Sequence, residues 1–212
     1  ETGLALGAVG TGAGKVLNGL TLTHPDQNIR AKAISFVREM IDFGAQFNAP
    51  AIIGSMQGSY GESTSKQDAL NYLTDALEEL GDHANTHGVS LIYEPLNRYE
   101  TNLFNLYLDA CEFIDQLSTN GVSLLADLFH MNIEEVDMAA SIKSSGEYVI
   151  HVHFADSNRR PAGNGHSDFS EVANVLKEIN YKGYVSAEAF AWPNSQSAAT
   201  QTIKTFNQYF NQ

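Results

Sequence analysis

Short apolar segments alternate with longer amphipathic segments along the whole chain. The short runs are rich in Val, Ile, Leu and Ala, a composition typical of strands that are buried on both faces of a parallel sheet. These predicted strands cover residues 4–9, 51–55, 89–94, 122–127, 149–153 and 184–188. Between them the apolar positions recur every three or four residues, as on one face of a helix. The predicted helices cover residues 27–47, 65–87, 103–117, 136–143, 169–179 and 195–210.

This alternation predicts an α/β fold that is built from repeated βα units around a parallel sheet. Gly88, Gly121, Gly146 and Gly183 each stand just before a predicted strand, which fits helix ends that are followed by short connections. No linker or low-complexity segment interrupts the 212 residues, so we expect a single domain over residues 1–212.

The predicted loops differ in length on the two sides of the strands. Those before the strands are short, whereas those after the strands are long and polar. The long loops cover residues 10–26, 57–64, 95–101, 129–135 and 156–168. In parallel α/β folds the functional residues gather at the carboxyl ends of the strands. The loop lengths therefore indicate that the functional site lies at this end of the sheet.

Four successive predicted strands end with a residue that can bind a metal ion, namely Glu94, Asp127, His153 and Glu188. Burying three carboxylates together is costly unless a cation neutralises them. Three carboxylates and one imidazole suit Mn²⁺, Mg²⁺ or Co²⁺ better than an ion that prefers thiolates.

Each of these residues also has a structural interpretation when it is taken alone. A glutamate at a strand end can be exposed or can cap a helix, Asp127 can cap the segment that follows it, and His153 can be a hydrogen-bonded core residue. His151 lies deeper in the same predicted strand, and we interpret it as a structural neighbour of the metal site. The glycine-rich segment 7–15 does not match the phosphate-loop pattern, because Val9 stands in place of its first glycine and Val16 in place of its Ser or Thr, and it also fails the spacing of the dinucleotide fingerprint.

Composition narrows the possible partners. The formal net charge is −13 and the isoelectric point is near 4.8, which argues against nucleic acid or an anionic membrane as the main partner. Cys111 is the only cysteine, so we expect a buried structural thiol and no intrachain disulfide. No apolar run reaches the roughly 18 residues that a membrane span needs. No signal peptide is recognised in a chain that begins at Glu1, and we expect a cytoplasmic protein.

The residues around the four strand ends carry a resemblance to a known family. They lie in the stretches Glu94-Pro-Leu-Asn-Arg-Tyr-Glu100, Ala126-Asp127-Leu-Phe-His130 and His151-Val-His153-Phe-Ala-Asp156-Ser-Asn-Arg159, and in Ser186-Ala-Glu188. The chain resembles the xylose-isomerase-like sugar phosphate isomerase/epimerase superfamily. Within it the chain looks most like the ketose 3-epimerases for D-tagatose, D-psicose and L-ribulose, and like 5-keto-L-gluconate epimerase.

The resemblance implies a TIM-type (β/α) barrel with one divalent metal ion, most simply Mn²⁺. Its four metal ligands fall on the residues already selected from the strand ends, and its acid–base pair falls on Glu94 and Glu188. Its substrate-binding residues fall on Glu100, His130 and Arg159.

The chain differs from the members of this family in its length at the N-terminal side. Its members begin with two further βα units, and this chain, with about six units, enters at what looks like the third strand. We therefore expect an N-terminally incomplete barrel. Its two open sheet edges favour association, so we expect either a homo-oligomer, most simply a dimer, or a piece of a longer natural protein.

The expected activity is the epimerisation of a keto sugar or keto sugar acid by proton transfer at C3 through an enediolate, with the two glutamates as acid and base. An aldose–ketose isomerase and a sugar-acid dehydratase of the same superfamily are alternatives. An endonuclease IV-like phosphodiesterase is disfavoured by the net charge of −13. A catalytically inactive binding module remains the alternative from a different class.

Overall fold

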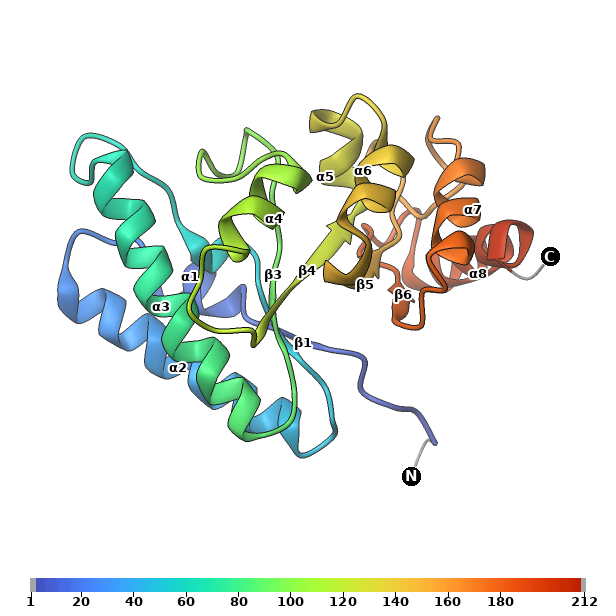
Figure 1. The fold of residues 1–212 in the computed structure, drawn as a ribbon. Helices are drawn as coiled ribbons and strands as arrows, with labels where there is room; N and C mark the ends of the chain where they lie inside the picture. The colour runs from blue at the N-terminus through green and yellow to red at the C-terminus, as the bar shows by residue number, and fades with distance from the viewer. Residues whose placement is uncertain (1–2, 211–212) are drawn as a thin grey trace. The chain divides into compact units, whose positions relative to one another are not determined.

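The computed structural model describes residues 3–210, and the chain forms two compact units (Figure 1). Unit 1 contains Glu1–Asn105 and Glu112–Ser123, and unit 2 contains Leu106–Cys111 and Leu124–Gln212. The prediction of one domain over residues 1–212 stays a prediction, and each unit is described by itself.

Unit 1 is built on three parallel strands. Strand β1 (Val9–Gly10) pairs with β2 (Ala51–Ile53), and β2 pairs with β3 (Leu91–Tyr93). The helical elements are α1 (Ala13–Asn18), α2 (Gln27–Ala45), the 3₁₀ turn η1 (Ser55–Gln57) and α3 (Lys66–Thr86). Both long helices begin where a side-chain oxygen accepts a backbone N–H, from Asn28 to Asp26 and from Asp68 to Ser65.

Unit 2 is built on the parallel strands β4 (Val122–Asp127), β5 (Val149–His153) and β6 (Tyr184–Ser186), although the first two residues of β4 belong to unit 1. The last residues of β4 and β5, Asp127 and His153, are partners in the register. The helical elements, of which α4 is shared by the two units, are α4 (Tyr107–Ile114), α5 (Leu128–Glu134), α6 (Met138–Ser145), η2 (Gly146–Tyr148), α7 (Ser170–Glu178) and α8 (Ser195–Phe210).

Most observed elements lie where the sequence predicted them. Strands β4 and β5 have the predicted bounds, and α8 begins and ends as expected. The first strand differs, because only Val9 and Gly10 find partners on β2, whereas Leu4 is 85% exposed. Helices α1 and α5 lie in segments that were predicted as loops.

The core of each unit is apolar, as the pattern predicts. In unit 1, Val37 and Ile41 of α2 and Leu73 and Leu77 of α3 are fully buried. In unit 2, the Phe154 and Phe169 rings meet edge to face, and Cys111 is buried as expected. No helix within residues 3–210 combines the length and the apolar character that crossing a membrane requires.

Candidate functional site

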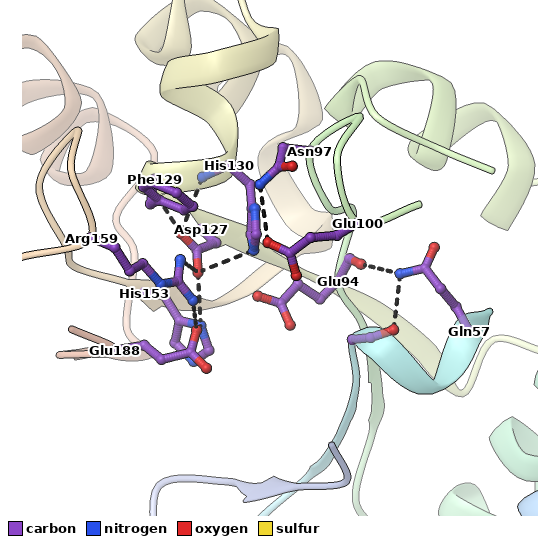
Figure 2. Close-up of polar contacts among 11 residues, drawn as sticks. Gln57, Glu94, Asn97, Glu100, Asp127, Phe129, His130, His153, Arg159 and Glu188 are labelled. Atoms are coloured by element: carbon purple, nitrogen blue, oxygen red, sulfur yellow. Dashed lines mark hydrogen bonds and ion pairs between the residues drawn. The ribbon is translucent and has the colours of Figure 1, made fainter. Parts of the chain in front are cut away.

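Three of the four predicted metal ligands lie together in unit 2 (Figure 2). Asp127 and His153 are the last residues of β4 and β5, and Glu188 follows the end of β6 by two positions. The residue exposures of Asp127 and His153 are 1% and 8%, whereas the Glu188 side chain is 51% exposed. Parallel pairing places these strand ends at the same edge of the sheet, and the group is open to solvent on the side of Glu188.

The donor atoms of these three residues converge. His153 Nδ1 lies 2.8 Å from Glu188 Oε2 and 3.2 Å from Asp127 Oδ2. One oxygen from each carboxylate and one imidazole nitrogen all lie within 4.8 Å of one another. Such a set of donors is close enough to share one ion.

Asp127 uses its two oxygens for different tasks. Oδ1 accepts the backbone N–H of Phe129 at 2.8 Å and that of His130 at 3.3 Å, so it caps α5. Oδ2 faces His153 and Arg159. Burial alone would raise the pKa of the Asp127 carboxyl, but the His153 hydrogen bond and the Arg159 charge outweigh burial and lower that pKa well below its ordinary value. The carboxyl is therefore ionised and can bind a cation.

Arg159 joins the two carboxylates. Its Nη1 lies 2.7 Å from Asp127 Oδ2, its Nη2 contacts Glu188 Oε2, and its guanidinium lies over the Phe129 ring at 4.7 Å. The Arg159 backbone has φ +60°, which is uncommon for a residue other than glycine. Contacts within the loop that contains Arg159 must therefore stabilise this unfavourable backbone conformation.

Asp156 organises that loop. Its fully buried carboxylate accepts backbone N–H groups from Ser157, Gly163 and Ser167 at 2.8, 2.8 and 3.1 Å. Burial raises the pKa of Asp156, but these backbone N–H donors outweigh it and lower the pKa below the ordinary 3.8. The Arg159 N–H closes the turn onto the Asp156 carbonyl at 2.8 Å. No pattern in the sequence predicts this role for Asp156, because its partners are backbone groups.

His130 and His151 flank the three predicted ligands in unit 2. His130 Nε2 lies 3.9 Å from Asp127 Oδ2. His151 Nε2 lies 2.7 Å from Ser186 Oγ. Burial, followed by the neighbouring His153, lowers the pKa of His151 to about 4, so His151 is neutral near pH 7. This environment fits the interpretation of His151 as a structural neighbour.

Unit 1 holds the remaining two candidate residues. Glu94 follows β3 directly and is 6% exposed; its N–H donates to the Ile53 carbonyl at 3.0 Å. Its own carbonyl accepts Gln57 Nε2 at 2.9 Å (Figure 2). A Cβ at Gly54 would lie 2.4 Å from Glu94 Oε2, so glycine makes room for this carboxylate. Glu100 Oε1 accepts Asn97 Nδ2 at 3.1 Å.

Gln57 was not among the residues selected from the sequence. It also accepts the hydroxyl proton of Tyr93 on Oε1 at 2.5 Å, which ties η1 to β3. No motif marks this glutamine, because two of its partners, Tyr93 and the Glu94 carbonyl, lie far from it in the sequence.

Comparison with known proteins decides the family. The family model described as "Xylose isomerase-like TIM barrel" matches residues 1–209. The chain belongs to the xylose isomerase-like TIM barrel family. The six strands β1–β6 within residues 3–210 agree with the prediction of about six βα units of such a barrel.

Several curated members of this family are named as ketose 3-epimerases. An L-ribulose 3-epimerase of Methylomonas sp. (strain DH-1) is 32% identical over 173 residues, which is 80% of this chain and 60% of that protein. A D-psicose 3-epimerase of Agrobacterium fabrum is 30% identical over 194 residues, which is 90% of this chain and 66% of that protein. The chain thus spans about three-fifths of the length of the relatives that it matches.

Solved structures of the same fold agree with this assignment. The D-allulose 3-epimerase from Methylomonas sp. in complex with D-allulose superposes with a TM-score of 0.81 and 28% identity, over 91% of this chain and 74% of that chain. An AP endonuclease, family 2, from Brucella melitensis superposes with a TM-score of 0.67 at 18% identity, which shows the fold alone.

Proposed function

We propose that this chain carries the site of a divalent-metal-dependent enzyme that epimerises a keto sugar or keto sugar acid. The observation that carries the proposal is the convergence of Asp127, His153 and Glu188 donor atoms within 4.8 Å of one another. Relatives at 30–32% identity are named ketose 3-epimerases, which supports the substrate class.

The donor set fits a divalent ion. Asp127 and Glu188 offer oxygens and His153 offers a nitrogen, and Glu94 of unit 1 would supply the fourth ligand. Oxygen-rich sites with one imidazole favour Mn²⁺, Mg²⁺ or Co²⁺, and we propose Mn²⁺. Bound there, the ion would act as a Lewis acid that polarises the sugar carbonyl and stabilises the negative charge that develops when the neighbouring C–H loses its proton.

The two glutamates would divide the proton transfer between them. One, ionised, removes the proton from C3 on one face of the sugar, and the other, protonated, gives a proton to the opposite face. A single base would tend to return the proton to the face from which it came. Because the Glu188 side chain is 51% exposed, its proton can exchange with water between turnovers. His130, Arg159 and Glu100 would hold the substrate oxygens.

Substitution of Glu188 by Gln tests this mechanism. With the metal-loaded protein and a ketose in D₂O, NMR should show deuterium at the inverted carbon for the wild type. Glu188→Gln should lower epimerisation by at least about 1,000-fold because it removes one of the two proton carriers, while circular dichroism stays unchanged. Glu178→Gln is the matched control, since Glu178 is an exposed carboxylate that pairs with Lys143 on the outer helices. Turnover near the wild-type level in Glu188→Gln would refute the two-glutamate mechanism.

The carbon at which the configuration is inverted is a separate question. A 3-dehydro-D-guloside 4-epimerase of Escherichia coli is 35% identical over 116 residues, which is 55% of this chain and 44% of that protein. The same residues could therefore serve a substrate whose carbonyl is at C3 and whose C4 is inverted. The position of the deuterium label distinguishes the two, and label at C1 or loss of water would instead indicate an isomerase or a dehydratase.

A further inference from the structure

A second group of residues that can bind a metal ion lies in unit 1, on two helices that run side by side (Figure 1). Asp42 belongs to α2, His83 lies in the last turn of α3, and His87 is the C-cap of α3. One donor atom from each of these three residues lies within 4.8 Å of the other two. None of the three takes part in the proposed epimerase chemistry.

The two imidazoles present the same nitrogen to one carboxylate oxygen. His83 and His87 are four residues apart, so they lie on the same face of the end of α3. His83 Nε2 lies 2.6 Å from Asp42 Oδ1, and His87 Nε2 lies 3.2 Å from the same oxygen. The rings meet edge to face with centroids 4.8 Å apart. Three potential ligand atoms from two helices therefore already lie close together.

Packing of the two helices holds the backbone on which this group stands. Asp42 follows the fully buried Ile41, and His83 precedes the fully buried Ala84, so the backbone at both positions is held in the core. The side chains of Asp42 and His87 are 47% and 39% exposed, and that of His83 is 17% exposed. An ion can therefore reach the group from solvent, and water can complete its coordination.

Arg38 opposes an ion at this position. Its Nη1 lies 3.0 Å from His83 Nδ1, and its Nη2 donates to Glu79 Oε1 at 2.5 Å. An arginine can only donate, so His83 Nδ1 must be the acceptor and the ring proton must be on Nε2, facing Asp42. Binding of a metal through Nε2 requires that proton to move to Nδ1, where it would face the Arg38 donor. The ion must therefore displace Arg38 from His83.

We propose that Asp42, His83 and His87 form a zinc-class metal site that bridges α2 and α3, and that Arg38 weakens it. Two imidazoles and one carboxylate match Zn²⁺, Co²⁺ or Ni²⁺, and are poorly suited to Mg²⁺ or Ca²⁺. Three protein ligands leave a fourth position for water. The bound ion would stabilise unit 1 by joining its two long helices.

The test is the number of Zn²⁺ ions that the whole chain binds. Protein stripped with a chelator is dialysed against micromolar Zn²⁺ at pH 7.5, and protein-bound zinc is measured by atomic emission. His87→Ala should bind one ion fewer per chain than the wild type, and Asp42→Asn should do the same. His166→Ala is the matched control, because it removes an exposed imidazole outside the group and should leave the count unchanged. Circular dichroism establishes that each variant is folded.

Arg38→Gln makes the test sharper. Glutamine removes the positive charge and offers an oxygen that can accept a proton from Nδ1, so zinc should bind about tenfold more tightly at this site. An unchanged zinc count in both His87→Ala and Asp42→Asn would overturn the site, and unchanged or weaker binding in Arg38→Gln would overturn the role of Arg38. Loss of an ion in Asp127→Asn alone would support the other metal site and refute this one.

Discussion

Arg159 contacts one oxygen of each of two candidate metal ligands, Asp127 Oδ2 and Glu188 Oε2, and these are the oxygens that lie nearest His153 Nδ1. A metal ion bound to these oxygens would compete with the guanidinium, so the two could not both keep their closest contacts. An arginine that gives up a carboxylate to the ion can turn its donors toward a sugar hydroxyl. This provides a physical basis for the assignment of Arg159 to substrate binding.

We therefore predict that Arg159→Ala separates metal binding from substrate binding. Mn²⁺ should bind at least as tightly as in the wild type, because a competing charge has been removed. KM for the ketose should rise by about tenfold or more, since a charge-assisted hydrogen bond contributes about 1.5–3 kcal/mol. Calorimetric titration with Mn²⁺ and steady-state kinetics measure the two effects. An equal loss of both would show that Arg159 maintains the site instead of contacting substrate.

At the scale of elements, sequence patterns predicted the bounds of some strands but not which residues of a strand or loop find hydrogen-bond partners. The patterns predicted the strands β4 and β5 with their bounds, because buried strands are continuous apolar runs. They predicted β1 over residues 4–9, but pairing with β2 includes only Val9 and Gly10. Where a neighbouring strand begins depends on how the sheet assembles, and the pattern of one strand does not contain that information. In the same way, the backbone N–H groups that donate to Asp156 are brought together only when the loop folds.

Short helices were missed for a related reason. Helix α5 has seven residues, too few for a clear apolar period, and it exists because Asp127 caps it and Leu128 and Met131 are buried. In contrast, the three candidate ligands of unit 2 were found from the sequence, because each stands at or just beyond a strand end, where chain topology brings the side chains together.

We predict that Asp156→Asn lowers the free energy of unfolding by about 1–3 kcal/mol, because that is the cost of a buried N–H that loses its acceptor. The substitution replaces one of the two carboxylate oxygens by an NH₂ group, which cannot accept a hydrogen bond. If the replaced oxygen is Oδ2, the Gly163 N–H loses the acceptor that it contacts at 2.8 Å. The folded-state pKa of Asp156 lies below its ordinary 3.8, so its contribution is fully present above pH 3.8 and is lost as pH falls through the folded-state value.

Urea denaturation at several pH values measures both effects. The wild type should lose stability on acidification below about pH 4 more steeply than Asp156→Asn, whose amide does not titrate. Ser167→Ala is the matched control, because it keeps the backbone N–H that Asp156 binds. Parallel acid limbs for the wild type and Asp156→Asn would contradict the assignment.

At the scale of the whole molecule we predict association of two copies. Within residues 3–210, β1 pairs only with β2 and β6 pairs only with β5. Close to β1, Val16 and Leu17 of α1 are 80% and 77% exposed, which is unusual for two adjacent large apolar side chains. Burial of this surface in a dimer would contribute favourably by the hydrophobic effect.

Sedimentation velocity at micromolar concentration checks the prediction. The expected result is a dimer of twice the 23.1 kDa chain mass, which Leu17→Glu shifts toward monomer. Lys204→Glu, on α8 of unit 2, adds the same side chain without removing an apolar one and should leave the dimer in place. A wild-type monomer at that concentration would contradict the prediction.

The divided use of Asp127 has a consequence for how this position can vary. One oxygen starts a helix and the other faces the candidate ligands, so two independent demands fall on a single side chain. Asparagine can cap α5, but it places a neutral amide where the candidate metal site needs a negative charge. Glutamate keeps the charge, but its longer side chain is a poor cap. Position 127 should therefore accept no other amino acid without loss, and a survey of all nineteen substitutions would separate those that loosen α5 from those that only remove the charge.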